Sequence, residues 1–339
     1  MCTAITIKSK QGDYFFGRTL DFLNDVFDDE NDFKAIATVY PKGCQLDGQL
    51  ESWENQYAFG GNGINNTIGL YDGVNEAGLA GELNALNECT WEELGQIKAE
   101  NKQPVIGEEL VSYMLSHFKN VAEVREAAKN LVLAKVDFAP LVDNKLFKRV
   151  PVHYIFVDPT GDSVVLEPLE NGHLKTFKSL GVMTNSPTYD WHVTNLRNYV
   201  NLQGFNAGNT QLDATVNGSD HLLEQIGFGS GLLGIPGDYT STSRFVRAAF
   251  LSRYIDDFDS QQGVDVLYSA FTSVMVPKGV ERADENALWG DSTQYWSGYD
   301  LKNHTFYVKA FDTNACLKRD VCDFEEITKF EIPHIDVFC

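Results

Sequence analysis

The chain has 339 residues, of which 43% are hydrophobic and 22% charged, proportions typical of a soluble globular protein. Its formal net charge of −21 argues against nucleic acid and anionic membrane surfaces as partners. The six cysteines lie far apart and the seven histidines are dispersed, which indicates neither a disulfide framework nor a metal site. Because no signal-peptide pattern and no apolar stretch of membrane-spanning length is visible, we expect a cytoplasmic protein.

The first residues of the chain predict a β-hairpin. Residues 2–8 alternate in strand fashion, residues 13–18 form a second strand pattern, and residues 9–12 supply the turn between them. A turn centred near Lys10 sets Cys2 opposite Arg18, within one or two positions of register. The hairpin therefore brings a cation close to the thiol.

Beyond the hairpin, hydrophobic periodicity predicts further strands and helices. Strands are expected at residues 35–40, 67–71, 79–83, 152–158, 163–167, 174–177, 181–184, 294–299 and 305–311. Helices are expected at residues 107–118, 121–131, 189–200, 243–258 and 264–274. Strands dominate both ends of the chain, blocks of helices lie between them, and no linker or repeat is visible. This order favours one α+β layered domain over residues 1–339.

Two local features carry more specific expectations. Thr242 or Ser243 is a natural N-cap for the helix that starts at residue 243. The glycine-rich run at residues 60–63 lacks the Gly-Lys-Ser/Thr ending of a phosphate loop, and we predict a flexible loop there.

Cys2 follows the initiator methionine directly, and methionine aminopeptidases remove Met1 when the next side chain is small. The mature chain would then begin with a thiol and a free α-amine on one residue. An α-amine has a pKa of about 7.7–8.0 and acts as a base near neutral pH, while a thiol is readily activated as a nucleophile. Retention of Met1 would bury the amine in a peptide bond and favour an inactive binding protein.

Charged residues near the predicted hairpin fit such chemistry. The Arg18 guanidinium would favour the thiolate form of Cys2. Asp21, three residues further on, is placed to hold and orient the new α-amine. The alternative for Arg18 and Asp21 is an ordinary surface ion pair of little energetic value.

Two residues far along the chain are further candidates. Asn185 lies at a strand end before Pro187, where its amide can donate a hydrogen bond to a developing oxyanion or merely cap the turn. Arg244 opens the predicted helix, where it suits an anionic group, or it pairs with Asp238.

Taken together, these segments resemble the choloylglycine hydrolase family of N-terminal-nucleophile hydrolases, which comprises bile salt hydrolases and penicillin V acylases. The order and spacing of the matching segments make the resemblance specific. It covers Met1-Cys2-Thr3-Ala4, Gly17-Arg18-Thr19-Leu20-Asp21, Tyr71-Asp72-Gly73-Val74-Asn75-Glu76-Ala77-Gly78-Leu79, Thr184-Asn185-Ser186-Pro187-Thr188-Tyr189-Asp190-Trp191-His192, Gly234-Ile235-Pro236-Gly237-Asp238 and Ser243-Arg244-Phe245.

The resemblance implies a four-layer αββα sandwich that hydrolyses linear amide bonds, as a homotetramer and without a metal or cofactor. It implies that Cys2 is the nucleophile, that its own α-amine is the base, and that Asp21 anchors this amine. Arg18 and Arg244 resemble the residues that flank the thiol, and Asn185 resembles the oxyanion donor.

The segment after Leu79 departs from the family pattern. Bile salt hydrolases typically have Ala-Gly-Leu-Asn and an aromatic residue there, whereas this chain has Gly81-Glu82-Leu83-Asn84-Ala85-Leu86. With a one-residue gap Asn84 fills the second oxyanion position, which we prefer because Leu83 then also matches; without the gap, Ala85 fills it. The missing aromatic residue favours an acylase of the penicillin V type, acting on N-acyl amides. The alternatives are a conjugated bile salt hydrolase releasing glycine or taurine, and an inactive binding protein.

Overall fold

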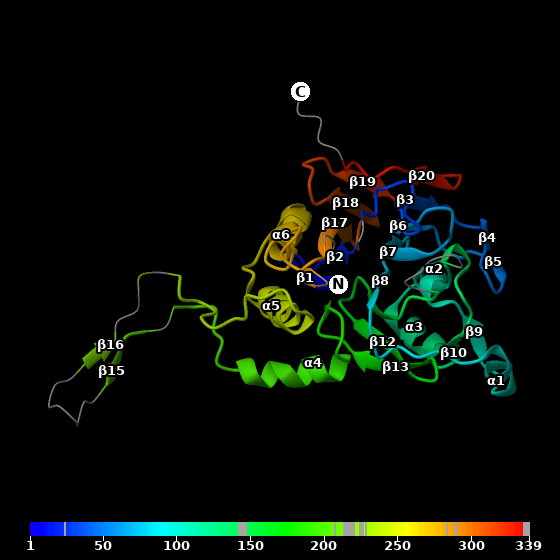
Figure 1. Ribbon diagram of the computed structural model, residues 1–339. Coiled ribbons are helices and arrows are strands. Elements are labelled where there is room, and N and C mark those ends of the chain that lie inside the picture. The colour runs from blue at the N-terminus through cyan, green and yellow to red at the C-terminus, as the bar shows by residue number, and fades with distance from the viewer. Residues whose placement is uncertain are drawn as a thin grey trace.

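The computed structural model describes residues 1–23, 25–141, 148–206, 208–212, 221–223, 227, 229–282, 284–287 and 290–334. Two large, mainly antiparallel sheets pack face to face, with helices on the outer face of each (Figure 1). This is the four-layer αββα sandwich that the resemblance implies, and the predicted α+β class is confirmed.

The first sheet has six strands and carries the N-terminus. Its order is β14 (Val182–Met183), β1 (Cys2–Lys8), β2 (Tyr14–Phe22), β17 (Ser292–Asp300), β18 (Thr305–Ala310) and β19 (Leu317–Asp320). Helices α5 (Ser241–Tyr254) and α6 (Gly263–Phe271) pack on its outer face. Residues from the two ends of the chain thus lie side by side in one sheet.

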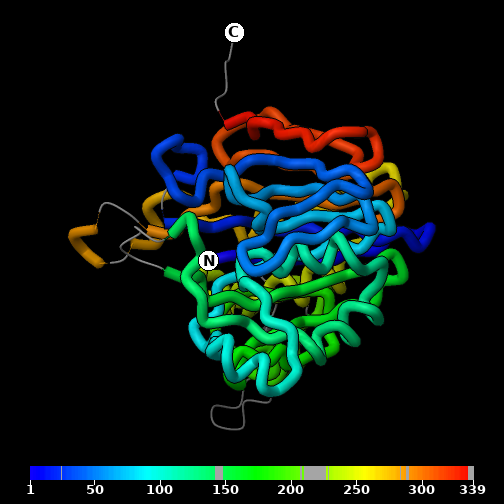
Figure 2. The backbone as a smooth tube through the Cα atoms, turned by 90° about the vertical axis from the view of Figure 1, so that its right-hand side faces the viewer, coloured from blue at the N-terminus to red at the C-terminus, as the bar shows by residue number. Residues whose placement is uncertain are grey.

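The second sheet has ten strands. Its order is β20 (Thr328–Phe330), β3 (Ala35–Tyr40), β6 (Phe59–Ile64), β7 (Leu70–Asn75), β8 (Ala80–Ala85), β11 (Val152–Val157), β12 (Ser163–Glu170), β13 (His173–Lys178), β10 (Leu131–Leu133) and β9 (Gln103–Val105). Helices α2 (Leu110–His117) and α3 (Val121–Ala128) cover it. Figure 2, viewed from the side of these helices, shows the red strand β20 beside the blue strand β3 at one edge.

Smaller elements lie outside these four layers. They are the strand pairs β4 (Gln45–Asp47) with β5 (Ser52–Glu54) and β15 (Thr210–Leu212) with β16 (His221–Leu223), the helices α1 (Leu94–Ala99) and α4 (Tyr189–Asn195), and the 3₁₀ turns η1 (Gly107–Glu109), η2 (Ala139–Leu141), η3 (Leu196–Tyr199) and η4 (Ser260–Gln262). The β15–β16 pair projects away from the body of the protein (Figure 1). None of the described helices is long and apolar enough to cross a membrane.

The predicted N-terminal hairpin is present, with its register displaced by two residues. Cys2 pairs with Leu20, and Arg18 pairs with Ala4. The displacement arises because the turn occupies residues 9–13 and is centred on Gln11, one residue beyond the expected centre at Lys10. Since alternate residues of a strand share a face, Cys2, Ala4 and Arg18 still project to the same side of the sheet.

Two other expectations are wrong. The run at residues 60–63 is part of the buried strand β6 and not a flexible loop, because its glycines allow a close approach of the neighbouring strand. A Cβ on Gly61 would lie 2.0 Å from the carbonyl oxygen of Asp72. The N-cap of α5 is Thr240, whose hydroxyl accepts from the N–H of Ser243, and neither Thr242 nor Ser243 has that role.

Candidate active site

Cys2 is the first residue of β1, and its side chain is only 5% exposed. Its sulfur accepts a hydrogen bond from Nη2 of Arg18 at 2.8 Å. The predicted proximity of cation and thiol is therefore present in the structure. The contact is diagonal across the β1–β2 hairpin, because Arg18 lies opposite Ala4 and reaches back along the strand.

Arg18 is fully buried, which excludes the alternative of a surface ion pair. Its Nη1 donates to the carbonyl oxygens of Tyr71 at 2.9 Å and Leu83 at 3.0 Å, which belong to the opposite sheet. The carboxylates of Asp72 and Glu82 each lie 3.6 Å from the guanidinium. One buried cation thus joins the two sheets and faces the thiol together with two carboxyl groups.

Burial raises the pKa of the Cys2 thiol, and the charge of Arg18 opposes that rise. The positive N-terminal amine lowers the pKa further, whereas the Asp21 carboxylate raises it. The thiolate therefore depends on Arg18 more than on any other side chain near it.

Asp21, at the end of β2, is also buried. Its Oδ1 accepts from the Thr293 hydroxyl at 2.6 Å, and its Oδ2 has no hydrogen-bond partner among the described residues. Burial raises the pKa of this carboxyl, while Arg244 and the N-terminal amine lower it. The amine of Met1 donates to the backbone oxygen of Asp21 and to Oδ2 of Asp291, both at 2.8 Å. With Met1 in place, the Asp21 carboxylate does not bind the amine.

Asn185 and Arg244 form one network around the backbone of Cys2. Oδ1 of Asn185 accepts from the Cys2 N–H at 2.7 Å and from Nη2 of Arg244 at 2.9 Å. Nη1 of Arg244 donates to the Cys2 carbonyl at 2.5 Å and to the Thr3 hydroxyl at 2.6 Å. The expected alternative of an Arg244–Asp238 pair is absent, because Asp238 accepts from Ser243 and other hydroxyls at the start of α5.

Asn84 lies on β8, opposite His153 of β11. Nε2 of His153 is 3.0 Å from the carbonyl oxygen of Thr184, beyond the end of β14, so the side chains of His153 and Asn84 face the six-stranded sheet. Nδ2 of Asn84 donates to Oε1 of Glu82 at 2.9 Å. Nδ2 of Asn185 donates to the backbone oxygen of Ala85 at 3.0 Å. The structure thus brings together all six predicted site residues.

A cavity of about 200 Å³ opens beside the Cys2 thiol. Most of the lining side chains are apolar. The cavity is lined by Met1, Cys2, Arg18, Leu20, Asp21, Phe22, Leu23, Phe33, Ile64, Leu70, Tyr71, Leu83, Asn84, Ala85, Asn87, Glu108, Val150, Pro151, Val152 and Asp291. Its shape and lining fit an apolar group attached to a carbonyl that reaches the sulfur.

Two carboxyl groups at the site were not predicted. Glu108 lines the cavity and is 4% exposed, and burial raises its pKa to about 7. Glu82 is fully buried, and burial raises its pKa to about 8. A signal for Glu82 existed in the sequence, since it is a single charged residue within a predicted strand between apolar neighbours.

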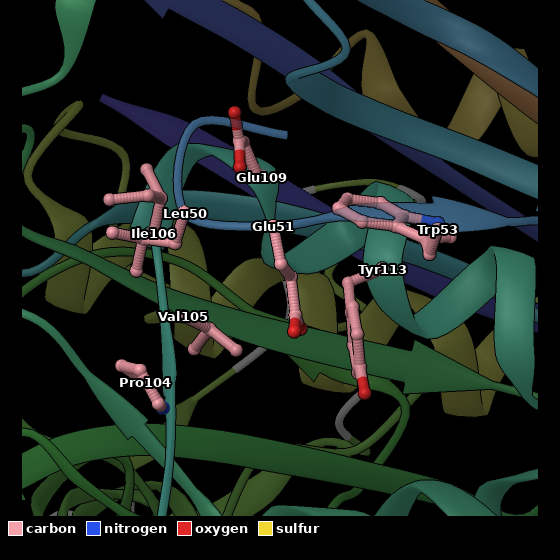
Figure 3. Close-up of a pocket in the computed structure, with 8 residues that line it drawn as sticks. All are labelled: Leu50, Glu51, Trp53, Pro104, Val105, Ile106, Glu109 and Tyr113. Atoms are coloured by element: carbon pink, nitrogen blue, oxygen red, sulfur yellow. The ribbon is translucent and has the colours of Figure 1, made fainter. Parts of the chain in front are cut away.

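A second pocket, between β5 and α2, holds only about 10 Å³ (Figure 3). That volume is about one water molecule. It is lined by Leu50, Glu51, Trp53, Pro104, Val105, Ile106, Glu109 and Tyr113, which include no thiol. The cavity beside the Cys2 thiol is the candidate active site because it combines this nucleophile with a mostly apolar lining.

Comparison with known proteins identifies a family for this chain. The family model for linear amide C–N hydrolases, choloylglycine hydrolase family, matches residues 2–324. A bile salt hydrolase/transferase of Clostridium perfringens is 30% identical over 324 residues, which cover 93% of this chain and 90% of the relative. A penicillin V acylase of Pectobacterium atrosepticum is 28% identical over 186 residues, or 55% of this chain and 41% of that protein.

The fold is similar to solved structures of such enzymes. The crystal structure of a variant of the conjugated bile acid hydrolase from Clostridium perfringens superposes with a TM-score of 0.82 at 27% identity, and the match covers 100% of both chains.

Proposed function

Since the chain belongs to the choloylglycine hydrolase family and is a hydrolase acting on linear amides, we propose that Cys2 is its nucleophile once Met1 has been removed. The observation that carries this proposal is the 2.8 Å hydrogen bond from Arg18 to the Cys2 sulfur beside an apolar cavity. The charge of the Arg18 guanidinium favours the thiolate, which is the reactive form, and so opposes the effect of burial.

The reaction follows from the groups around the sulfur. The α-amine of mature Cys2 takes the thiol proton, and the sulfur attacks the amide carbonyl carbon while the carbonyl electron pair moves to oxygen. Collapse of this intermediate breaks the C–N bond, and the ammonium proton goes to the leaving amine. Water then attacks the thioester and gives a proton to the α-amine. Cleavage of the C–S bond releases the acid and restores the thiol.

The remaining site residues have supporting roles in this proposal. Asn185 and Asn84 donate to the oxyanion, and we prefer Asn84 to Ala85 because the Asn84 side chain faces the sheet that carries Cys2. Asp21, whose Oδ2 lacks a partner in the described part of the chain, accepts from the new α-amine. Arg244 fixes the Cys2 backbone and the Asn185 amide.

The mostly apolar lining of the cavity supports an N-acyl amide substrate with an apolar acyl group. Met1 is part of this lining, so its removal would enlarge the space that receives the acyl group. The small Ala85 side chain at its wall is consistent with an acylase of the penicillin V type.

Hydrolysis of conjugated bile salts, with release of glycine or taurine, is the second candidate. It is favoured by the relatives, since the bile salt hydrolase/transferase matches 93% of this chain and the penicillin V acylase 55%. We propose a cytoplasmic homotetramer for either substrate, which light scattering tests.

Comparing turnover of penicillin V with that of a glycine-conjugated bile salt separates the two candidates. We expect higher kcat/KM for penicillin V; a strong preference for the bile salt would reverse this order. Intact-mass measurement of the same sample should show loss of Met1. Cys2→Ala should abolish both activities with the fold intact. A protein that keeps Met1 and binds these compounds without turnover would be the inactive binding protein instead.

A further inference from the structure

Glu82 connects the two groups that activate the proposed reaction. Its Oε2 lies 3.6 Å from Nε of Arg18, which binds the thiol, and its Oε1 accepts from Nδ2 of Asn84 at 2.9 Å. Glu82 and Asn84 are two residues apart on β8, so their side chains share one face. A single buried carboxyl therefore contacts both the guanidinium beside Cys2 and the second proposed oxyanion donor.

The polar atoms of this pair are incompletely satisfied. Oε2 of Glu82 and Oδ1 of Asn84 are both buried, and neither has a hydrogen-bond partner within the described ranges. A buried polar group without a partner is unfavourable, so two of them on hydrogen-bonded side chains call for an explanation. A proton on Glu82 supplies one, because a carboxylic acid donates as well as accepts.

The charges that face Glu82 come from three strands. Arg18 on β2 lowers its pKa, whereas Asp72 on β7 and Asp21 on β2 raise it, and burial has the largest effect. Asp72 is itself held by the hydroxyls of Tyr295 and Tyr299 and by Nδ2 of Asn62. His153 of β11, opposite Asn84, is directed to Glu167 and Thr184. Arg18 is therefore shared among Glu82, Asp72 and the thiolate of Cys2, three groups that can carry negative charge.

The protonation state of Glu82 decides which end of the Asn84 amide it binds. An ionised carboxylate only accepts, so it binds Nδ2, as in the structure. A protonated carboxyl donates to Oδ1, and the amide turns over, since its two ends have the same shape. Nδ2 then leaves Glu82 and takes the place that Oδ1 now has, on a residue that lines the cavity with Cys2.

We propose that Glu82 is a positioning residue whose protonated form turns the Asn84 amide so that Nδ2 donates to the oxyanion. The inference rests on the proposed function, because it assumes an acyl transfer at Cys2. Ionisation of Glu82 then withdraws the donor and also places a negative charge beside Arg18. Turnover accordingly falls as the pH rises through the pKa of Glu82.

The pH dependence of kcat with penicillin V, or with the preferred bile salt, tests this inference. The α-amine base of Cys2 also titrates near pH 8, and because this effect is common to all variants, kcat is compared between variants at each pH. We expect the ratio of wild-type kcat to Glu82→Gln kcat to fall about tenfold between pH 7 and pH 9, because a group with a pKa near 8 ionises only in the wild type, whereas Gln keeps an N–H donor toward Oδ1. Glu109→Gln is the matched control, because Glu109 also has a pKa raised to about 7 by burial and lies outside the cavity lining. It should retain the wild-type profile.

Asn84→Ala gives an independent measurement if Glu82→Gln fails to fold. It removes the donor, so kcat should fall by about 10²–10³ at pH 7, and its ratio to the wild-type kcat should rise about tenfold toward pH 9. A folded Glu82→Gln or Asn84→Ala enzyme whose kcat keeps a constant ratio to the wild type from pH 7 to pH 9 overturns the inference. Neither result bears on the proposal that Cys2 is the nucleophile. That proposal fails only if the Cys2→Ala variant remains active.

Discussion

The two sides of the cavity differ in how their charges are paired. On the side of Cys2, formed by β1, β2, β14 and α5, Arg18 and Arg244 are fully buried and donate to backbone and side-chain oxygens around the sulfur. On the facing wall, Glu108 of η1 lines the cavity, and Glu82 of β8 accepts from Asn84, which also lines it. Both carboxyl groups are buried, and burial raises the pKa of both. The first side holds positive charge at the reacting atom, and the second holds carboxyls that are readily protonated. The comparison suggests that the arginines determine reactivity, whereas the wall determines pH response and stability.

Replacing Arg18 should have the largest effect on activity and stability of any change on the side of Cys2. Arg18→Leu removes the hydrogen bond to the Cys2 sulfur and leaves Asp72 and Glu82 without their cation. We expect kcat/KM to fall by more than about 10²-fold and the free energy of unfolding to fall by about 3–5 kcal/mol, as for one broken partner of a buried ion pair. Urea denaturation and steady-state kinetics measure both.

The matched control is Arg125→Leu, which removes a half-exposed pair with Asp162 at the surface. Arg125→Leu should lower the free energy of unfolding by less than about 1 kcal/mol and leave kcat/KM unchanged. Equal losses for the two variants would mean that burial of Arg18 adds nothing to its contribution.

Removing the Asn185 amide tests the side of Cys2 at a second residue. Asn185→Ala loses the acceptor for the Cys2 N–H and for Arg244, and also the proposed oxyanion donor. We expect kcat to fall by about 10²–10³-fold with a smaller change in KM, because the oxyanion exists only in the transition state. Asn198→Ala, at an exposed amide of η3, is the control. A rise in KM alone would make Asn185 a binding residue.

The residues on the side of Cys2 could be predicted from the sequence better than those on the facing wall, for a physical reason. Cys2 and Arg18 are joined by a local hairpin, whose pairing follows from strand alternation even when the register shifts by two. Asn185 and Arg244 come from distant segments, and only the resemblance to a family placed them beside Cys2. Four of the six predicted residues, Cys2, Arg18, Asp21 and Asn84, line one cavity. Asn185 and Arg244 bind the backbone of Cys2 beside it.

The wall could not be predicted because it depends on long-range packing. Strand β6 was expected as a loop, since its glycines are unfavourable in strands unless another backbone comes close, as Asp72 does at Gly61. Glu108 follows a helix-like pattern in the sequence, and only the packing of η1 against residues 150–152 brings it to the cavity. Neither burial nor a raised pKa is visible in a local pattern.

Glu108→Gln tests whether the wall lowers stability at neutral pH. The pKa of Glu108 in the folded protein is about 7, above its ordinary value of 4.5, so the folded state binds this proton more tightly than the unfolded state. Its stabilising effect is therefore complete below pH 4.5 and is lost as the pH rises to about 7. We compare the free energy of unfolding of Glu108→Gln with that of the wild type at pH 4.5 and at pH 8. We expect this difference to shift by about 1–3 kcal/mol in favour of the variant between the two pH values.

Urea denaturation at the two pH values measures this difference. Gln keeps an oxygen for the N–H of Val150, which donates to Oε1 of Glu108 at 2.7 Å. The exposed Glu126→Gln serves as control and should show no such gain. A Glu108 variant that behaves like the control would mean that its carboxyl is hydrated in the cavity.

Thr240→Ala gives the smallest effect and returns to the side of Cys2. The Thr240 hydroxyl caps α5, the helix that carries Arg244, by accepting from the N–H of Ser243. Loss of an N-cap costs about 1 kcal/mol, whereas Thr242→Ala, at the position expected from the sequence, should cost less. Because Arg244 is also fixed by the oxygens of Cys2 and Asn185, kcat should change less than about twofold in either variant. Thermal unfolding and kinetics on the two proteins check this. A larger fall in kcat for Thr240→Ala would mean that the start of the helix, and not the network at Cys2, sets the position of the arginine.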